Sequence, residues 1–302
     1  MPTRMRPRNP DAELLTKEAE PVKKSRARQI AIYGKGSIGK STISCNLSAA
    51  LAEMGLTVMQ VGCSPKADST AFLRGGEVMD NPVLEYSRAH GMDEKKIMDC
   101  IKKGYKGIYC AESGGPDPGA GCAGRGVAMA LEWFKKYDIY DKLGVDIVIY
   151  DSIADVVCGG FGQPMKQGFA EEVYIVTSGE LMSTYSANNI CKAIKTVAEA
   201  GANTRACGFL VNLRGVEHEI ELVTDFAERL GVPIMGIIPR SPLIQKAEAK
   251  GGTVVQMFPD SPEAKQYREL AKMVWENKNK YMPTPITLEE IIGLARKHKA
   301  FE

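Results

Sequence analysis

The sequence predicts an α/β fold, in which helices cover both faces of a mainly parallel sheet. Two patterns support it: short apolar runs alternate with amphipathic segments from residue 29 onward, and a glycine-rich motif directly follows the first of those runs. Apolar strands that alternate with helices are typical of parallel sheets buried on both sides. Ligands of such sheets bind at the carboxyl ends of the strands, so we expect functional residues at that edge.

Each expected element has a local reason. Residues 29–33 form an apolar run that ends at Gly34, which predicts a strand. Residues 41–54 carry apolar side chains at helical spacing and stop before Gly55, which predicts a helix. The same criteria predict further strands at residues 57–62, 145–150, 173–177, 207–211 and 233–238, and helices at 183–200, 220–230 and 287–298.

The composition is that of an ordinary globular protein. The chain has 302 residues, of which 44% are hydrophobic and 25% are charged, and its formal net charge of +2 gives no reason to expect a nucleic-acid partner. No apolar run is long enough to span a membrane, so we expect no membrane association. Eight cysteines in a chain of this size, with no signal peptide, favour reduced thiols and a cytoplasmic location over a disulfide framework.

Charge is concentrated in the first 28 residues. That segment holds eight Lys or Arg and four acidic residues, a net charge of +4, with few apolar side chains. We therefore expect residues 1–28 to form a disordered basic tail and residues 29–302 to form one P-loop domain. A docking arm for an acidic partner is an alternative reading of the tail, and a targeting peptide is a weaker one because acidic residues are interspersed.

A phosphate-binding motif lies between the first expected strand and the first expected helix. Residues 34–42 read Gly-Lys-Gly-Ser-Ile-Gly-Lys-Ser-Thr, which matches the Walker A pattern in its required context. The glycines let backbone N–H groups point at phosphates, and the helix N-terminus adds positive potential. Asp151 ends an apolar strand, as a Walker B acid does, and would hold Mg²⁺ through water. The residues expected to bind nucleotide here are Gly34, Gly36, Ser37, Gly39, Lys40, Ser41 and Thr42, with Ser41 on Mg²⁺.

A second lysine follows the first glycine of this motif. Within one subunit Lys40 already serves the phosphates, so Lys35 needs another role or is a solvated loop residue. With a lysine at this place, the motif resembles that of the deviant Walker A class. This class includes partition, septum-positioning and arsenite-pump ATPases and nitrogenase-type iron proteins. In those families it reaches across a dimer to the nucleotide of the other subunit.

Two cysteines stand in glycine-rich settings. Cys122 lies in Gly-Ala-Gly-Cys-Ala-Gly-Arg-Gly and Cys158 in Asp-Val-Val-Cys-Gly-Gly-Phe, where exposed amides can donate hydrogen bonds to cluster sulfurs. A [4Fe–4S] cluster needs four thiolates, and two per chain become four across a two-fold axis. Cys45, Cys191 and Cys207 fall in expected strands or helices, where a core position is the better interpretation. Cys63, Cys100 and Cys110 are ambiguous, with a core position favoured.

At this point the chain resembles a known family. Residues 34–42, 61–70, 112–127, 151–161 and 178–190 closely resemble the nitrogenase iron protein and its relatives, and the resemblance extends over residues 29–280. It implies a homodimer bridged by one [4Fe–4S] cluster, one MgATP per subunit, and electron delivery to a separate nitrogenase-like catalytic component. It also implies ferredoxin or flavodoxin as the source of electrons.

The resemblance assigns roles to the motifs around the cluster and the phosphates. Cys122 and Cys158 are the implied cluster ligands, and Lys35 is the implied trans-acting lysine. Asp155 would position the attacking water within a switch segment that joins Asp151 to Cys158, so that a movement at the γ-phosphate reaches the iron.

Further roles follow for residues outside those motifs. Lys66 and Asp68 are implied to form a first switch that faces nucleotide and partner, and Asp68 joins Lys35 and Asp155 as a candidate catalytic residue. Arg125 resembles a docking arginine beside the cluster. The residues that resemble an adenine pocket are Asn212, Arg240 and Gln245, and a strand-end turn is the plain alternative for Asn212.

Several positions depart from the family pattern. The family usually has Asp at Ser64, Gly at Ser37, Leu-Gly around Ile153 and Ala154, and an acid at Ser241. Because every implied cluster ligand and phosphate-binding lysine is kept, we expect cluster and ATP binding with altered switching. We therefore favour a nitrogenase-like reductase, such as a methylthio-alkane reductase, over the nitrogenase iron protein proper. A non-redox partition-type ATPase and a regulatory paralogue are the alternatives.

Overall fold

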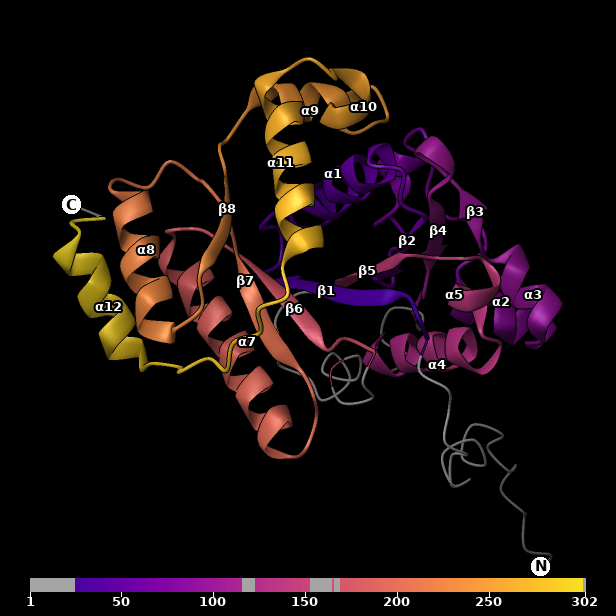
Figure 1. The fold of residues 1–302 in the computed structure, drawn as a ribbon, viewed down its shortest axis with the longest axis horizontal. Coiled ribbons are helices and arrows are strands. Elements are labelled where there is room, and N and C mark those ends of the chain that lie inside the picture. The colour runs from indigo at the N-terminus through magenta and orange to yellow at the C-terminus, as the bar shows by residue number, and fades with distance from the viewer. Residues whose placement is uncertain (1–24, 116–122, 153–164, 166–168, 301–302) are drawn as a thin grey trace, which may run out of the picture.

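One eight-stranded sheet organises the molecule. The computed structural model describes residues 25–115, 123–152, 165 and 169–300, and for Ala123 and Arg125 the backbone alone. The strand order is β3-β4-β2-β5-β1-β6-β7-β8, and every neighbouring pair is parallel except β3 with β4 (Figure 1). The expected α/β fold with a mainly parallel sheet is confirmed.

The strands are β1 (Arg28–Gly34), β2 (Val58–Cys63), β3 (Lys102–Lys103), β4 (Tyr109–Glu112), β5 (Ile147–Ser152), β6 (Glu172–Thr177), β7 (Arg205–Asn212) and β8 (Ile234–Ile238). The helices are α1 (Lys40–Glu53), α2 (Val83–His90), α3 (Glu94–Asp99), α4 (Ala123–Lys136), α5 (Ile139–Lys142), α7 (Leu181–Glu199), α8 (Glu219–Leu230), α9 (Pro242–Ala249), α10 (Val254–Met257), α11 (Pro262–Glu276) and α12 (Leu288–Lys297). Two short 3₁₀ turns occupy Ala71–Leu73 and Tyr105–Gly107.

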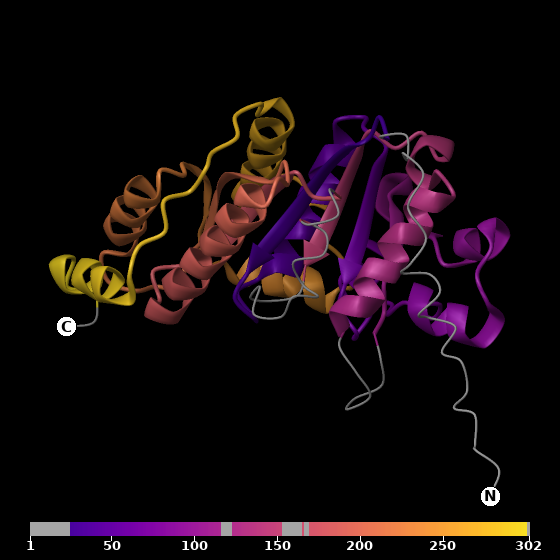
Figure 2. The same cartoon turned by 90° about the horizontal axis from the view of Figure 1, so that it is seen from below.

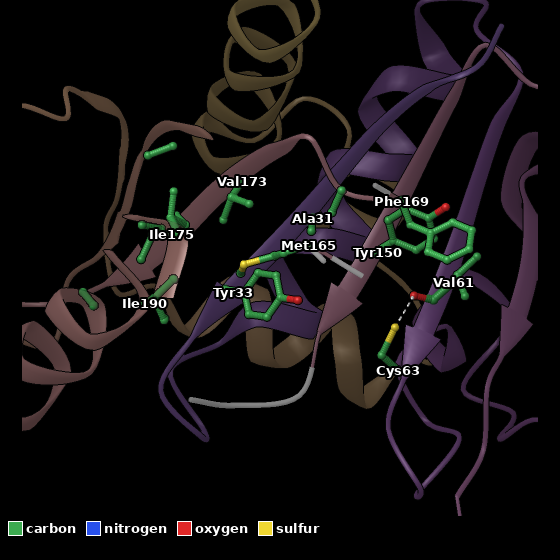
Figure 3. Packing of buried hydrophobic residues seen from close by; sticks show 14 of the residues in the cluster. Ala31, Tyr33, Val61, Cys63, Tyr150, Met165, Phe169, Val173, Ile175 and Ile190 are labelled. Atoms are coloured by element: carbon green, nitrogen blue, oxygen red, sulfur yellow. Dashed lines mark hydrogen bonds between the residues drawn. The ribbon is translucent and has the colours of Figure 1, made fainter. Parts of the chain in front are cut away.

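Each face of the sheet carries its own hydrophobic core. Successive side chains of β1 alternate between the two, because Ala31 and Tyr33 join one cluster while Ile30 and Ile32 join the other. Figure 3 shows the first cluster, where Tyr33 of β1 lies on the same side of the sheet as Tyr150 of β5. The helices α4, α7, α8 and α12 cover this face, and α1, α9, α10 and α11 cover the opposite one (Figures 1 and 2).

Five further strands and three further helices were expected after the first strand and the first helix. All eight occur within two residues of their expected limits. The strand expected at 145–150 extends further, since Asp151 and Ser152 pair with Gly62 and Cys63 of β2. The two strands at the β3–β4 edge were not expected, because two and four residues are too short to show a period.

The boundary between tail and domain requires a correction. Arg28 was counted with the basic tail, but it is the first residue of β1, and its guanidinium is 2.6 Å from the Glu172 carboxylate. It also donates hydrogen bonds to the carbonyls of Val274 and Trp275, each at 2.7 Å. A strand can start on a charged residue when the side chain is paired in this way. Ser25 and Arg26 of the expected tail donate hydrogen bonds to the Asp141 carboxylate, and residues 1–24 lie outside the described residues.

The C-terminal helix α12 uses its apolar face inside the molecule. Ile291, Leu294 and Ala295 are buried against α7 and α8 (Figure 2, yellow helix), and Thr287 begins the helix with a capping box. This packing disfavours a role for α12 as a membrane-targeting helix. Within the described residues, no helix is long and apolar enough to cross a membrane.

Candidate nucleotide site

The P-loop joins β1 to α1 at the carboxyl edge of the sheet. Gly39 immediately precedes α1 with a φ of 101°, a left-handed conformation that favours glycine. A Cβ atom there would lie 2.5 Å from Nδ2 of Asn212. That same amide nitrogen donates a hydrogen bond to the Ile38 carbonyl at 2.6 Å. Asn212 at the end of β7 therefore fixes the P-loop as well as lining the pocket described below.

The Lys40 side chain is held within the P-loop by a backbone carbonyl. It is 8% exposed, and Nζ donates a hydrogen bond to the carbonyl oxygen of Lys35 at 2.9 Å. A neutral carbonyl is a weak partner for an ammonium group compared with a phosphate, so an entering nucleotide can take over this contact. Ser37 adopts a left-handed φ of 60° in the exposed part of the loop, which is consistent with glycine being the usual residue there.

Asp151 lies in β5 beside the P-loop with one carboxylate oxygen free. Its side chain is 4% exposed, and Oδ2 accepts a hydrogen bond from the Ser69 hydroxyl at 2.5 Å. Among the described residues, Oδ1 has no hydrogen-bond partner. Burial raises the pKa of Asp151 above its ordinary value, and the Ser41 and Ser69 hydroxyls and the nearby Lys40 ammonium oppose that rise. A buried carboxylate with one free oxygen fits the binding of a magnesium-bound water, since Mg²⁺ usually keeps part of its hydration shell.

A pocket of about 220 Å³ opens beside the P-loop, at the ends of β7 and β8. The three residues expected at the adenine line it together, and so do P-loop residues. Glu248 of α9 was missed from the sequence, although it lies one helical turn after Gln245. Its Oε1 accepts a hydrogen bond from the Thr42 hydroxyl at 2.6 Å, so the pocket and the P-loop are directly linked. The lining includes Ser37, Gly39, Thr42, Asn212, Arg214, Arg240, Ser241, Gln245, Glu248 and Tyr267.

The segment expected to form the first switch has an exposed part and a buried part. Lys66 and Asp68 are exposed, and the Ser64 hydroxyl accepts a hydrogen bond from the Lys66 amide at 3.2 Å. Ser69 and Thr70 are buried and anchor the segment, Ser69 to Asp151 and Thr70 to Glu112. The exposed residues can therefore respond to a ligand while the anchor keeps the segment against the sheet.

Glu112 is a buried carboxyl group that was not expected at the site from the sequence. It is 0% exposed at the end of β4, and Oε1 accepts hydrogen bonds from the amide and hydroxyl of Thr70, both at 2.7 Å. Burial raises its pKa to about 8, with the Asp151 and Asp68 charges adding to the rise and the Thr70 bonds opposing it. A Cβ on Gly62 would collide with Oε2 of Glu112, so a larger residue there would displace this carboxyl group.

The expected cluster ligands lie outside the described residues. This holds for Cys122, Cys158 and Asp155, and also for the side chain of Arg125. The six described cysteines are buried and free, as expected for core residues, and burial raises the pKa of each thiol. In Figure 3 the Cys63 sulfur faces the Val61 carbonyl of its own strand. Within the described part, no group of three His, Cys, Asp or Glu residues could hold a metal ion.

Comparison with known proteins identifies relatives of the whole domain. Residues 28–300 match the model of the 4Fe-4S iron sulfur cluster binding proteins, NifH/frxC family. Nitrogenase iron protein 2 of Methanothermococcus thermolithotrophicus is 45% identical over 283 residues, which cover 90% of this chain and 96% of that protein. The nitrogenase iron protein of Methanospirillum hungatei is 46% identical over 272 residues, with the same coverage of 90% and 96%.

Solved structures with a similar fold include a septum-positioning ATPase. The septum site-determining protein MinD of Pyrococcus horikoshii, complexed with Mg-ADP, superposes with a TM-score of 0.65. It is 23% identical, and the match covers 83% of this chain and 96% of that one. At this identity the likeness supports the P-loop fold alone.

Proposed function

We propose that this chain, which belongs to the 4Fe-4S iron sulfur cluster binding family of nitrogenase iron proteins, donates electrons to a nitrogenase-like reductase other than nitrogenase itself. The choice of reductase rests on the chain's departures from the family pattern at Ser37, Ser64 and Ala154. Members of this family bind a [4Fe–4S] cluster and MgATP and act as ATP-hydrolysing electron-transfer components, so the expected cofactors and enzyme class are confirmed. A non-redox ATPase switch shares the fold, but its solved representative is 23% identical, against 45% for the iron protein.

The observation that carries the proposal is the state of Asp151. Its Oδ1 accepts no hydrogen bond from a described residue, and in the sequence Asp151 begins the segment that ends at Cys158. In the proposed cycle Lys40, Ser41 and Thr42 hold the phosphates and Mg²⁺, while Asp151 holds the magnesium-bound water. A change of ligand at this carboxylate would move the start of an eight-residue segment, 151–158, that ends in the proposed cluster thiolate.

Residues from two subunits complete the proposed site. Cys122 and Cys158 of both chains would supply four thiolates to one cluster on the two-fold axis of a homodimer. Lys35 would reach the nucleotide of the partner subunit. Asp155 would position the attacking water, and Asp68 would take part in the first switch. Ferredoxin or flavodoxin remains the expected electron source, and Arg125 the expected docking residue.

Ser64 supports the choice of a nitrogenase-like reductase. A hydroxyl stands where the family usually carries a carboxylate, and it accepts a hydrogen bond from the Lys66 amide within its own turn. The loss of a negative charge beside the nucleotide would change the conformational response of the first switch to MgATP binding. A reductase acting on a small organosulfur compound, as methylthio-alkane reductases do, fits a divergent switch matched to a different catalytic component.

The test is electron delivery to defined catalytic components. The purified dimer, MgATP and dithionite are combined either with a methylthio-alkane reductase catalytic component or with a nitrogenase molybdenum–iron component, and product is measured in each. Turnover with the first component alone supports the proposal. Turnover with the nitrogenase component alone identifies a nitrogenase iron protein proper. A cluster that responds to MgATP but supports neither reaction points to the regulatory paralogue.

A further inference from the structure

Gln60 is a buried amide at the centre of β2. Its side chain is 0% exposed, in a strand whose residues are all buried. A buried amide costs stability unless its donors and its acceptor are all paired. Around Gln60 they are, because polar groups from α1 and from the first switch meet at this point. An apolar residue would fill the same space without needing these partners, so the polar network suggests a function beyond packing.

The partners fix which way the amide points. The Ser69 carbonyl can only accept, and Nε2 of Gln60 donates to it at 3.0 Å. On the other side, the Ser48 hydroxyl donates to Oε1 at 2.7 Å. The alternative orientation would place Oε1 against the Ser69 carbonyl, two acceptors facing each other. The Nε2 group of Gln60 therefore faces the first switch.

The orientation of the amide determines the direction of the next hydrogen bond. Nε2 of Gln60 also donates to the Ser69 hydroxyl oxygen at 3.1 Å. Because that oxygen accepts from Gln60, its single proton is directed to the other neighbour, Oδ2 of Asp151 at 2.5 Å. Asp151 in turn keeps Oδ1 free, on the carboxylate that we assign to the magnesium-bound water.

We propose that Gln60 is a positioning residue for magnesium binding: through the Ser69 hydroxyl it holds the Asp151 carboxylate with one oxygen free for the metal's water. This inference rests on the proposed function only in taking Asp151 as the magnesium-side acid. The path runs from the P-loop helix α1 through β2 and the first switch to β5, and its members Ser48, Gln60 and Ser69 are at most 1% exposed. Fixed hydrogen-bond chains of this kind keep a site pre-organised.

The experiment measures nucleotide affinity with and without Mg²⁺. Isothermal titration of ADP into the anaerobic, cluster-containing protein is carried out for wild type, Gln60→Met, Ser69→Ala and the double variant. We expect Gln60→Met to reduce the Mg²⁺-dependent gain in affinity about tenfold, the worth of one hydrogen bond near a charge, and to leave Mg²⁺-free affinity unchanged. Ser69→Ala should do the same, and the double variant should lose no more than either single one.

Two further variants separate positioning from packing. Cys45→Ala removes a thiol that donates to the Ser69 carbonyl and accepts a hydrogen bond from Nε2 of Gln60 at 3.6 Å. Because the hydrogen bonds from Gln60 to the Ser69 hydroxyl and from that hydroxyl to Asp151 are left in place, this variant should keep the Mg²⁺-dependent gain. Gln60→Met with Ser48→Ala removes the hydroxyl that the first change leaves unpaired, so it should restore thermal stability while the Mg²⁺ effect persists.

Two results would overturn the role of Gln60: equal losses of affinity with and without Mg²⁺, or losses that add when combined with Ser69→Ala. A wild-type protein whose ADP affinity does not depend on Mg²⁺ would instead overturn the assignment of Asp151 as the magnesium-side acid, and the role of Gln60 with it. Electron delivery to a catalytic component is not part of this measurement, so failure of the proposed reductase function would appear separately.

Discussion

Replacing Glu112 with glutamine should remove a pH dependence of folding. The folded-state pKa of about 8 lies above the ordinary value of 4.5, so the folded protein keeps this proton at pH values where the unfolded chain has lost it. The stabilisation is therefore complete below about pH 4.5 and is lost as the pH rises through 8, at about 1.4 kcal/mol per pH unit. Over that interval of about 3.5 units the loss reaches about 5 kcal/mol as an upper limit.

Glutamine cannot lose a proton, and its side-chain oxygen can still accept both hydrogen bonds from Thr70. We expect Glu112→Gln and wild type to have similar free energies of unfolding at pH 5, and the variant to become the more stable by several kcal/mol at pH 8. The assay is anaerobic, nucleotide-free urea unfolding at four pH values, followed by circular dichroism. Glu94→Gln, at an exposed carboxylate, is the matched control and should run parallel to wild type.

Parallel profiles for Glu112→Gln and wild type from pH 5 to pH 8 would refute the reasoning. They would mean that Glu112 is ionised in the folded state and that its two hydrogen bonds from Thr70 outweigh its burial. Thr70→Val provides an internal check, since removing one donor to the carboxylate should raise the pKa further and steepen the pH dependence.

Three other predictions concern the cluster, the dimer and the fold. Cys122→Ser or Cys158→Ser should abolish cluster assembly, while Cys45→Ser, at a fully buried thiol, should keep the cluster. Iron content and the visible spectrum measure cluster assembly. A full cluster in either of the first two variants would contradict the ligand assignment. Lys35→Ala should bind ATP but lose coupled turnover, and normal turnover would count against a trans-acting lysine. Arg28→Ala should destabilise the fold by about 2 kcal/mol, because it leaves three carbonyls without their donor and the half-buried Glu172 carboxylate with Lys280 alone. A urea midpoint within error of wild type would exclude that role.

The nucleotide-binding edge could be predicted because its signals are local. The P-loop shows its glycines and lysine in one short segment between a strand and a helix, and Gly39 has the positive φ that such a loop requires. Asp151 was also recognisable, as an acid at the end of an apolar run. The adenine residues Arg240 and Gln245 came from the family resemblance, and the structure places both on one pocket with Asn212.

What the sequence could not predict depends on contacts between distant segments. Glu112 and Gln60 look like ordinary polar residues within apolar runs, and either could have been exposed. Their roles appear only when Thr70 and Ser69 of the first switch fold back on the sheet and supply partners. Glu248 was missed for a similar reason, because its partner Thr42 is 206 residues away in the chain.

The most direct test of the central claim is to count iron and record EPR spectra of the anaerobically purified, dithionite-reduced protein with and without MgATP. We predict about four irons per dimer and a signal that changes when MgATP binds, because the proposed switch segment joins Asp151 to Cys158. A cluster whose signal ignores MgATP would contradict the coupling. Protein without iron under rigorously anaerobic conditions would contradict the assignment of Cys122 and Cys158.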